Sequence, residues 1–289
     1  MTAVVPSPSA PRVRPAPLLS MVRSELRWVF RRPRNLVGLG LLSLLPVVFG
    51  VGIALDDGPN SGGGGGDSSL ISQVAGNGLV LPVAALSMAI FLLLPLAVSI
   101  VAADALAGES SHGTLRGLLL APVGRLRLVV VKVAGVLALA VVAVLLIALV
   151  GVVTGLIVVG DAGGTTLSLS GTELSLPAVL ARVALAAAWT VGQLCAIGAI
   201  ALAVSSFTEH PLVVLAVSVG WLVISTVLTA IPALDWLWPM LLPTGWPAMA
   251  DVLRDPVPLG ELAQSTYRAG CYVLIGLGLT FARMLTRDA

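Results

Sequence analysis

The residue types that carry most enzyme chemistry are scarce in this sequence. The chain has two histidines, His112 and His210, and two cysteines, Cys195 and Cys271, each cysteine inside an apolar run. The histidines lie in different connections between apolar segments, and we interpret both as solvated or packing residues. The patterns H-E-x-x-H, C-x-x-C and G-x-S-x-G do not occur. The sequence therefore predicts no catalytic residue, no metal site and no bound cofactor in this chain.

A nucleotide-binding P-loop is also missing. Lys132 is the sole lysine and it follows Val131, whereas the P-loop pattern requires a lysine directly after a glycine. The run Gly62–Gly66 has no such lysine and is typical of a flexible connector. If ATP is used, it must be bound with its Mg²⁺ by another subunit.

One connection between apolar segments gathers several polar residue types. Asp104 and Glu109 lie where the second apolar segment ends, and Pro122 ends an amphipathic stretch that follows them. Physically this is a short surface helix held between two apolar segments, so a force on it would move both. The candidate site residues are Asp104, Glu109, Ser110, Ser111, His112, Gly113, Thr114, Leu115 and Arg116.

The composition shows whether water or lipid surrounds the elements that position these residues. The chain has 289 residues, of which 57% are hydrophobic and 10% are charged, whereas soluble proteins contain about 25% charged residues. Too little polar surface remains to cover a water-facing globule. The composition therefore excludes a soluble globule, a nucleic-acid binder and a disulfide scaffold, and it predicts an all-α integral membrane protein.

Six apolar segments are long enough to span a membrane, which takes about 20 residues. The sixth is the weakest, and a re-entrant segment is the alternative there. Apart from a disordered leader at 1–17, residues 18–289 are expected to form one membrane domain. The predicted spans are 36–55, 79–103, 128–159, 180–204, 211–231 and 266–285.

Ionisable residues are confined to the ends of these segments, which disfavours a proton- or ion-driven carrier. The polar groups that could line a pathway are Gln193, Ser225 and Thr229. Gln193 either bonds across helices or lines the pathway. A passage with so few polar groups suits amphipathic or lipid-like cargo better than sugars or ions.

The positions of the basic residues predict the orientation of the chain in the membrane. They cluster before the first span, between spans two and three, and after span six, whereas the opposite side holds only Arg182, Arg254 and Arg268. Six alternating spans put the three basic clusters on one face. By the positive-inside rule we expect that face, with both termini, to be cytoplasmic in the cell membrane.

Two flanking segments have their own patterns. Residues 18–33 predict an amphipathic helix at the inner membrane surface, with Arg23, Arg27 and Arg31 on its polar face and lipid as its partner. The alternative is a basic flank that only orients the first span. On the outer side, the segment 232–265 is rich in Trp and Pro and fits short re-entrant helices, or else an ordinary aromatic belt.

The connection after the second span resembles the permeases of the ATP-binding-cassette (ABC) type-2 export family. The resemblance rests on an ordered set of residues within about thirty positions, supported by the layout of an interfacial helix and six spans. That set is Asp104, Ala107-Gly108-Glu109, Gly113-Thr114-Leu115, Leu118-Leu119, Pro122-Val123, Arg125 and Lys132.

The resemblance implies an ABC exporter subunit with three further properties. The segment from Asp104 to Arg116 would be a coupling helix that docks into a separate ATP-binding subunit, and the interfacial helix would be the second contact. A second permease subunit, identical or different, would complete the pathway. Asp104 would pair with Arg27 or Arg31, and Glu109 would meet a basic residue of the partner or cap the coupling helix. The rival functions are a membrane scaffold that transports nothing and an ion-gradient-driven carrier.

Overall fold

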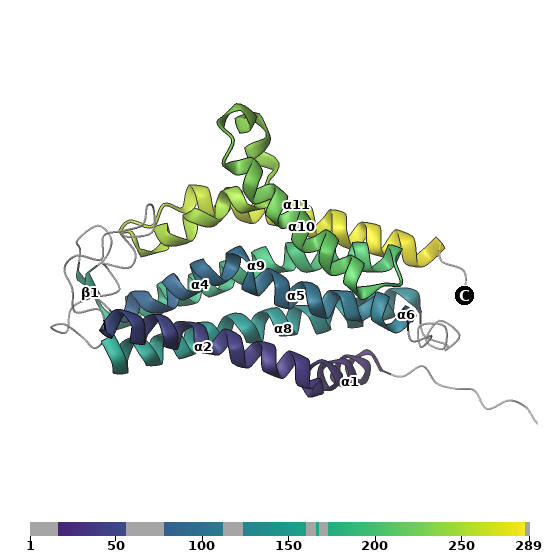
Figure 1. Cartoon of the computed structure of the whole chain (residues 1–289), viewed down its shortest axis with the longest axis horizontal. Coiled ribbons are helices and arrows are strands. Elements are labelled where there is room, and N and C mark those ends of the chain that lie inside the picture. Colours follow the sequence, from purple (N-terminus) through teal and green to yellow (C-terminus); the bar gives the residue numbers. More distant parts are fainter. Residues whose placement is uncertain (1–16, 56–77, 112–123, 160–165, 168–172, 287–289) are drawn as a thin grey trace, which may run out of the picture.

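The computed structural model describes residues 17–55, 78–111, 124–159, 166–167 and 173–286. Within these ranges six helical segments are long and apolar enough to cross a membrane (Figure 1). They are α2 (Pro33–Leu55), the run Leu93–Ser111 that begins with α5 (Leu93–Ala103), α8 (Arg125–Thr154) with its extension, α9 (Leu176–Phe207), α10 (Pro211–Thr229) and α11 (Leu259–Thr286). The all-α membrane fold with six spans is confirmed. A small departure is an antiparallel pair of two-residue strands, β1 (Thr166–Leu167) and β2 (Glu173–Leu174).

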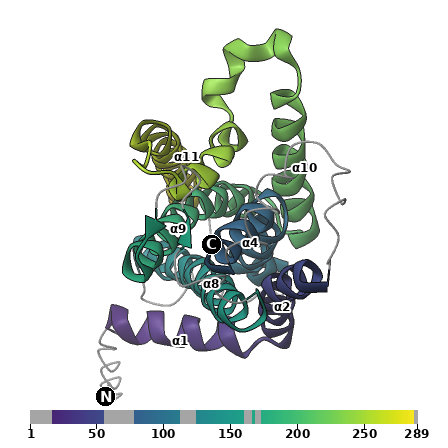
Figure 2. The same ribbon diagram turned by 90° about the vertical axis from the view of Figure 1, so that its left-hand side faces the viewer.

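The helices divide into a buried centre and an exposed periphery. α5 and α9 are the most buried spans, whereas α2, α10 and α11 expose most of their apolar surface. Figure 2 shows α8, α9 and α4 (Leu81–Phe91) in the middle of the bundle, with α10 rising at one side. Exposed apolar side chains are stable in lipid, because the lipid tails are as apolar as they are.

The second span differs most from the expected range 79–103. It begins with η1 (Gly78–Val80) and α4, breaks at Leu92, and resumes as α5. The break lies in the turn before Pro95, which has no N–H to bond the carbonyl four residues earlier. We expected the helix to end at Ala103. Instead it continues through a π-helical segment, η2 (Asp104–Gly108), into α6 (Glu109–Ser111).

The helix expected at 18–33 and the third span are both helical, with approximately the expected bounds. The interfacial helix α1 covers Leu18–Arg31, and Arg32 is extended before Pro33 opens α2. The third span continues past Thr154 as a π-helical segment, η3 (Gly155–Val159). The leader, apart from Pro17, lies outside the described residues.

The segment before the last span contains two 3-10 helices, η4 (Pro232–Met240) and η5 (Leu242–Leu253). Trp236 is 70% exposed, but Trp246 is 1% exposed and packs edge-to-face on Phe91, with ring centroids 5.4 Å apart. Trp246 therefore packs inside the described bundle and is not part of an aromatic belt at the membrane surface. α11 is one continuous helix that starts seven residues before the expected position 266, which favours a full sixth span over a re-entrant segment.

Candidate coupling site

Four parts of the chain meet at one end of the bundle, which we call the basic end. They are α1, the run from η2 to α6, the beginning of α8, and the last turns of α11 (Figure 1). Arg125 of α8 joins the last two of these, because its guanidinium donates to the carbonyls of Met284 and Leu285 at 2.9 and 2.6 Å. The basic segments that are far apart in sequence are thus neighbours in space.

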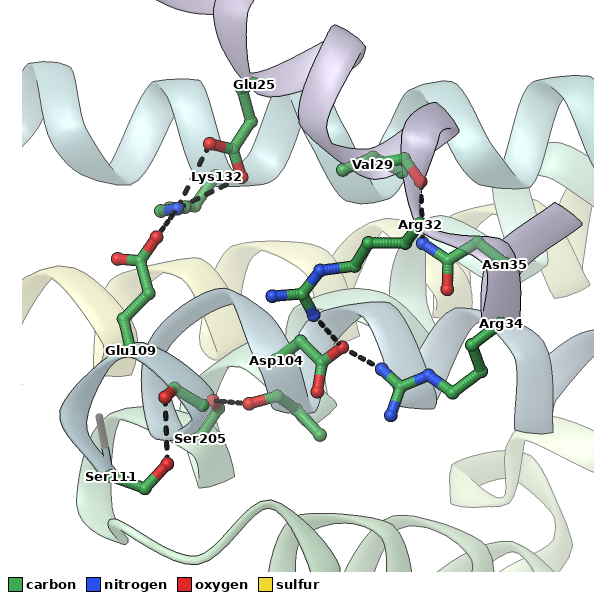
Figure 3. Close-up of polar contacts among 12 residues, drawn as sticks. Glu25, Val29, Arg32, Arg34, Asn35, Asp104, Glu109, Ser111, Lys132 and Ser205 are labelled. Carbon is green, nitrogen blue, oxygen red and sulfur yellow. Dashed lines mark hydrogen bonds and ion pairs between the residues drawn. The ribbon is translucent and has the colours of Figure 1, made fainter. Parts of the chain in front are cut away.

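Lys132 is the centre of one polar cluster at the basic end (Figure 3). Its side chain is 4% exposed, and its Nζ lies 3.0 and 3.1 Å from the two carboxylate oxygens of Glu25 in α1. The same Nζ also pairs with Glu109 of α6. One ammonium group therefore joins α1, α6 and α8, and we call these three residues the lysine triad.

The approach of α1 to α8 depends on a glycine one turn after the lysine. A Cβ at Gly135 would lie 3.1 Å from Cγ of Glu25 and 3.5 Å from a methyl of Val29. Because contacts this short are rare, the absence of a side chain at Gly135 lets α1 come close enough for Glu25 to reach Lys132. The sequence thus positions this carboxylate through a small residue on the opposite helix.

Asp104 is the centre of a second cluster. Its carboxylate accepts from both Arg32 and Arg34, and Arg32 also lies over the ring of Trp28, 3.4 Å from the centroid (Figure 3). Burial lowers the pKa of the Arg32 guanidinium, and the carboxylates of Glu109 and Glu25 act in the opposite direction. Arg32 therefore interacts electrostatically with the lysine triad as well as with Asp104.

The expected pairing of Asp104 with Arg27 or Arg31 is wrong. These two arginines and Arg23 are all exposed on the surface of α1. The reason is geometric, because α1 ends at Arg31 and the extended Arg32 turns the chain toward α5 before α2 begins. Asp104 consequently bonds the residues on both sides of Pro33 instead of the exposed face of α1.

The π-helical turn after Asp104 is stabilised by α9. The hydroxyl of Ser205 accepts from the Ala107 N–H at 2.9 Å and donates to the Ala103 carbonyl at 3.2 Å. A π-turn displaces backbone groups from their usual partners, and such turns are frequent at functional sites. Ser205 was not among the residues that sequence analysis identified, because a serine in an apolar helix gives no signal of its partner.

The far end of the predicted coupling segment is only partly described. Ser110 donates to Glu209, between α9 and α10, at 3.2 Å, and the exposed Ser111 donates to the Gly108 carbonyl at 2.8 Å. His112, Gly113, Thr114, Leu115 and Arg116 lie outside the described residues. The described part of the segment thus contacts α1, α8, α9 and the α9–α10 connection.

The three residues considered for a pathway lie on two helices, Gln193 on α9 and Ser225 and Thr229 on α10. Gln193 is 1% exposed and donates across helices to the Ser265 carbonyl of α11 at 3.4 Å, which favours the first of its two predicted roles. Ser225 is buried in α10. Thr229, one turn later, donates to the Thr226 carbonyl of its own helix at 2.7 Å.

Sequence analysis identified two of the six charged residues in these clusters as site residues, namely Asp104 and Glu109. It missed Glu25, Arg32 and Arg34 as partners, and it named Lys132 only as the sole lysine and as part of the family resemblance. A signal was available, since Lys132 is the single lysine of the chain and a lone cation near an apolar run needs an anion. Among the described residues no group of His, Cys, Asp and Glu is arranged to hold a metal ion.

Comparison with known proteins gives one match. The family model described as "ABC-2 family transporter protein" matches residues 26–250, from α1 to η5, which is most of the chain. No curated protein matches the sequence. The matched range contains five of the six charged residues of the two clusters, all except Glu25.

Proposed function

The chain belongs to the ABC-2 transporter family, and we propose that it is the permease subunit of an ATP-driven exporter of small amphipathic or hydrophobic compounds, such as a drug, an antibiotic or a lipid-like molecule. Membership of this family makes it a multi-pass membrane component of an ABC transporter, with an ABC ATP-binding subunit as its partner. Since the chain has no P-loop, ATP and Mg²⁺ would be bound and ATP hydrolysed in that partner.

The observation that carries the proposal is the pair of charged clusters at the basic end. They tie the interfacial helix, the start of α8 and the run from η2 to α6 to one another through side chains that are mostly buried. A partner that pushes on the segment after Glu109 would therefore displace α1 and α8 together. Closure of the ATP-binding subunits could in this way reorient the spans around the cargo.

The orientation and the assembly belong to the same proposal. The basic end faces the cytoplasm of the cell membrane, where the ATP-binding subunit is found, and a second permease subunit completes the pathway. The charge asymmetry of the sequence supports this orientation. The exposed apolar face of α10 offers surface for the second subunit.

The test is reconstitution with the ATP-binding subunit that copurifies in mild detergent, identified by mass spectrometry. Ser111→Trp places a large side chain at the exposed end of α6, and Thr286→Trp is the matched control at the exposed end of α11. We expect Ser111→Trp to lose copurification and cargo-stimulated ATP hydrolysis, and the control to retain both. Unchanged coupling in both variants would contradict docking at this segment, and transport that follows an ion gradient without ATP would favour a carrier.

The orientation has a separate test. Single cysteines replace Ser111 at the basic end and Gly260 near the start of α11, in a chain whose Cys195 and Cys271 are alanine. Both positions are exposed, and a Cβ at Gly260 meets nothing within 4 Å. A membrane-impermeant thiol reagent should label intact cells at position 260 and not at position 111. The opposite labelling would invert the protein and remove the coupling proposal with it.

A further inference from the structure

A groove lies between α2 and α5 on the side of the bundle next to the Asp104 cluster. Its volume is about 340 Å³, within the range of about 300 to 1,000 Å³ typical of small-molecule sites. It is lined by residues 34–42 of α2 other than Leu36 and Gly40, by Leu93, Leu96, Ala97 and Ile100 of α5, and by Leu139 of α8. Apart from Arg34 and Asn35 the lining is apolar. Val37 and Leu41 are exposed at its rim, so the groove opens toward the surrounding lipid.

The polar end of the groove carries positive charge. The Arg34 side chain is 55% exposed while one of its nitrogens bonds Asp104. Arg32 also binds this carboxylate and interacts with Glu25 and Glu109, so the positive charge at the mouth of the groove comes from the exposed guanidinium of Arg34 (Figure 3). Arg31, just before them in the chain, is also exposed. The groove therefore combines a basic mouth with an apolar interior.

We propose that this groove binds one acyl chain of an anionic membrane lipid, whose phosphate is held at Arg34. A guanidinium binds phosphate oxygens with charge-assisted hydrogen bonds, and the apolar lining matches a hydrocarbon chain. A zwitterionic lipid offers the same chain but no net negative charge, so the basic mouth selects the anionic lipid. The inference does not depend on the proposed transport function.

Two glycines of α2 provide a matched pair of variants. Gly38 lines the groove, Gly40 does not, and a Cβ at either position meets nothing within 4 Å. Leucine at position 38 should therefore fill the groove without a clash, and leucine at position 40 should leave the groove open. Both changes replace a glycine by the same residue in the same helix, so their general effect on the helix is similar.

The experiment uses the full chain in phosphatidylcholine vesicles with a small fraction of a lipid that carries a photoactivatable group in its acyl chain. The probe is phosphatidylglycerol or phosphatidylcholine with the same chains, and crosslinked peptides are identified by mass spectrometry. We expect phosphatidylglycerol to crosslink to 34–42 and 93–100 about fivefold more than phosphatidylcholine, in line with the effect of one basic residue near an anionic lipid. Arg34→Gln should remove this preference, and Gly38→Leu should remove the crosslinks.

The outcomes separate this site from its alternatives. Equal crosslinking of both lipids in the wild-type chain would mean that ordinary bulk lipid fills the groove and would overturn the proposal. No crosslinking at these peptides in any variant would mean that a second copy of the chain or the cargo covers the groove, which also overturns it. Loss of crosslinks in Gly40→Leu as well as Gly38→Leu would assign the effect to the helix and not to the groove. Retention of the crosslinks in Gly40→Leu together with their loss in Gly38→Leu supports the proposal.

Discussion

The two ends of the bundle hold their charged side chains in different ways. At the basic end, cations pair with carboxylates from other elements, as Lys132 does with Glu25 and Glu109. At the opposite end, Arg268 donates to the Leu241 carbonyl at 2.6 Å and to Thr244, and Arg182 donates to the Arg254 carbonyl at 2.6 Å. There Arg268 and Arg182 bind backbone oxygens that short 3-10 helices and loops leave without helical partners. The ion pairs at this end, Arg182 with Asp255 and Arg254 with Asp251, each have one partner that is 43% or 60% exposed.

This difference decides what the loss of one side chain leaves behind. At the basic end it leaves an uncompensated charge in a mostly buried cluster, which is costly. At the opposite end it leaves neutral carbonyls next to exposed segments, where water can replace the lost donor. The basic end should therefore resist the separate movement of its elements, whereas the opposite end should tolerate change.

Lys132→Met should have the largest effect, because it leaves Glu25 and Glu109 together without the ammonium group that bonds both of them. We expect a loss on the order of 3–5 kcal/mol of folding free energy, the cost of breaking a buried pair, measured as thermal unfolding of the purified protein in detergent. Arg127→Met, exposed on the same helix, is the control and should change nothing measurable. Adding Glu25→Gln and Glu109→Gln to Lys132→Met should restore most of the stability. No recovery in that triple variant would mean that charge is not the cause.

Asp104→Asn should cost less, about 1.5–3 kcal/mol for hydrogen bonds to a charged group. The effect is smaller because Arg32 and Arg34 are 34% and 55% exposed, so water can solvate them once the carboxylate is gone. The same unfolding measurement also separates the two pairings considered for Asp104. Arg27→Gln and Arg31→Gln should leave stability unchanged, and a large loss in either would support the pairing expected from sequence.

Arg268→Gln should have a smaller effect on stability, on the order of 1 kcal/mol. The expected structural change is local, because Arg268 joins α11 to the junction of η4 and η5 through Leu241 and Thr244. We expect faster proteolysis in 232–253 with little change in the unfolding temperature. An effect as large as that of Lys132→Met would erase the contrast between the two ends.

Asp255→Asn should have the smallest effect. Asp255 pairs with Arg182 at 3.1 Å but its side chain is 43% exposed, and exposed ion pairs contribute about 0–1 kcal/mol. The remaining bonds of Arg182 to backbone carbonyls should hold the loop in place. A loss of more than about 1 kcal/mol of folding free energy in thermal unfolding would show that the charge of Asp255 matters at this end too.

The sequence by itself determined the solvent, the number of spans and the amphipathic α1. A membrane span constrains the composition of one continuous stretch of sequence, since every span must contain about 20 mostly apolar residues. That requirement is local, so it can be recognised without knowing which helices are neighbours. The ordered residues from Asp104 to Lys132 likewise indicated the family from a single stretch of chain.

Only the tertiary structure decided the partners of the charged residues and the shape of the second span. Glu25 reaches Lys132 because Gly135 lets α1 approach α8, and Asp104 meets Arg32 and Arg34 because the chain turns at Arg32. The helix continues past Asp104 because Ser205, about a hundred positions away, bonds its π-turn. Such contacts depend on which faces of distant helices meet, and no pattern within one helix contains that information.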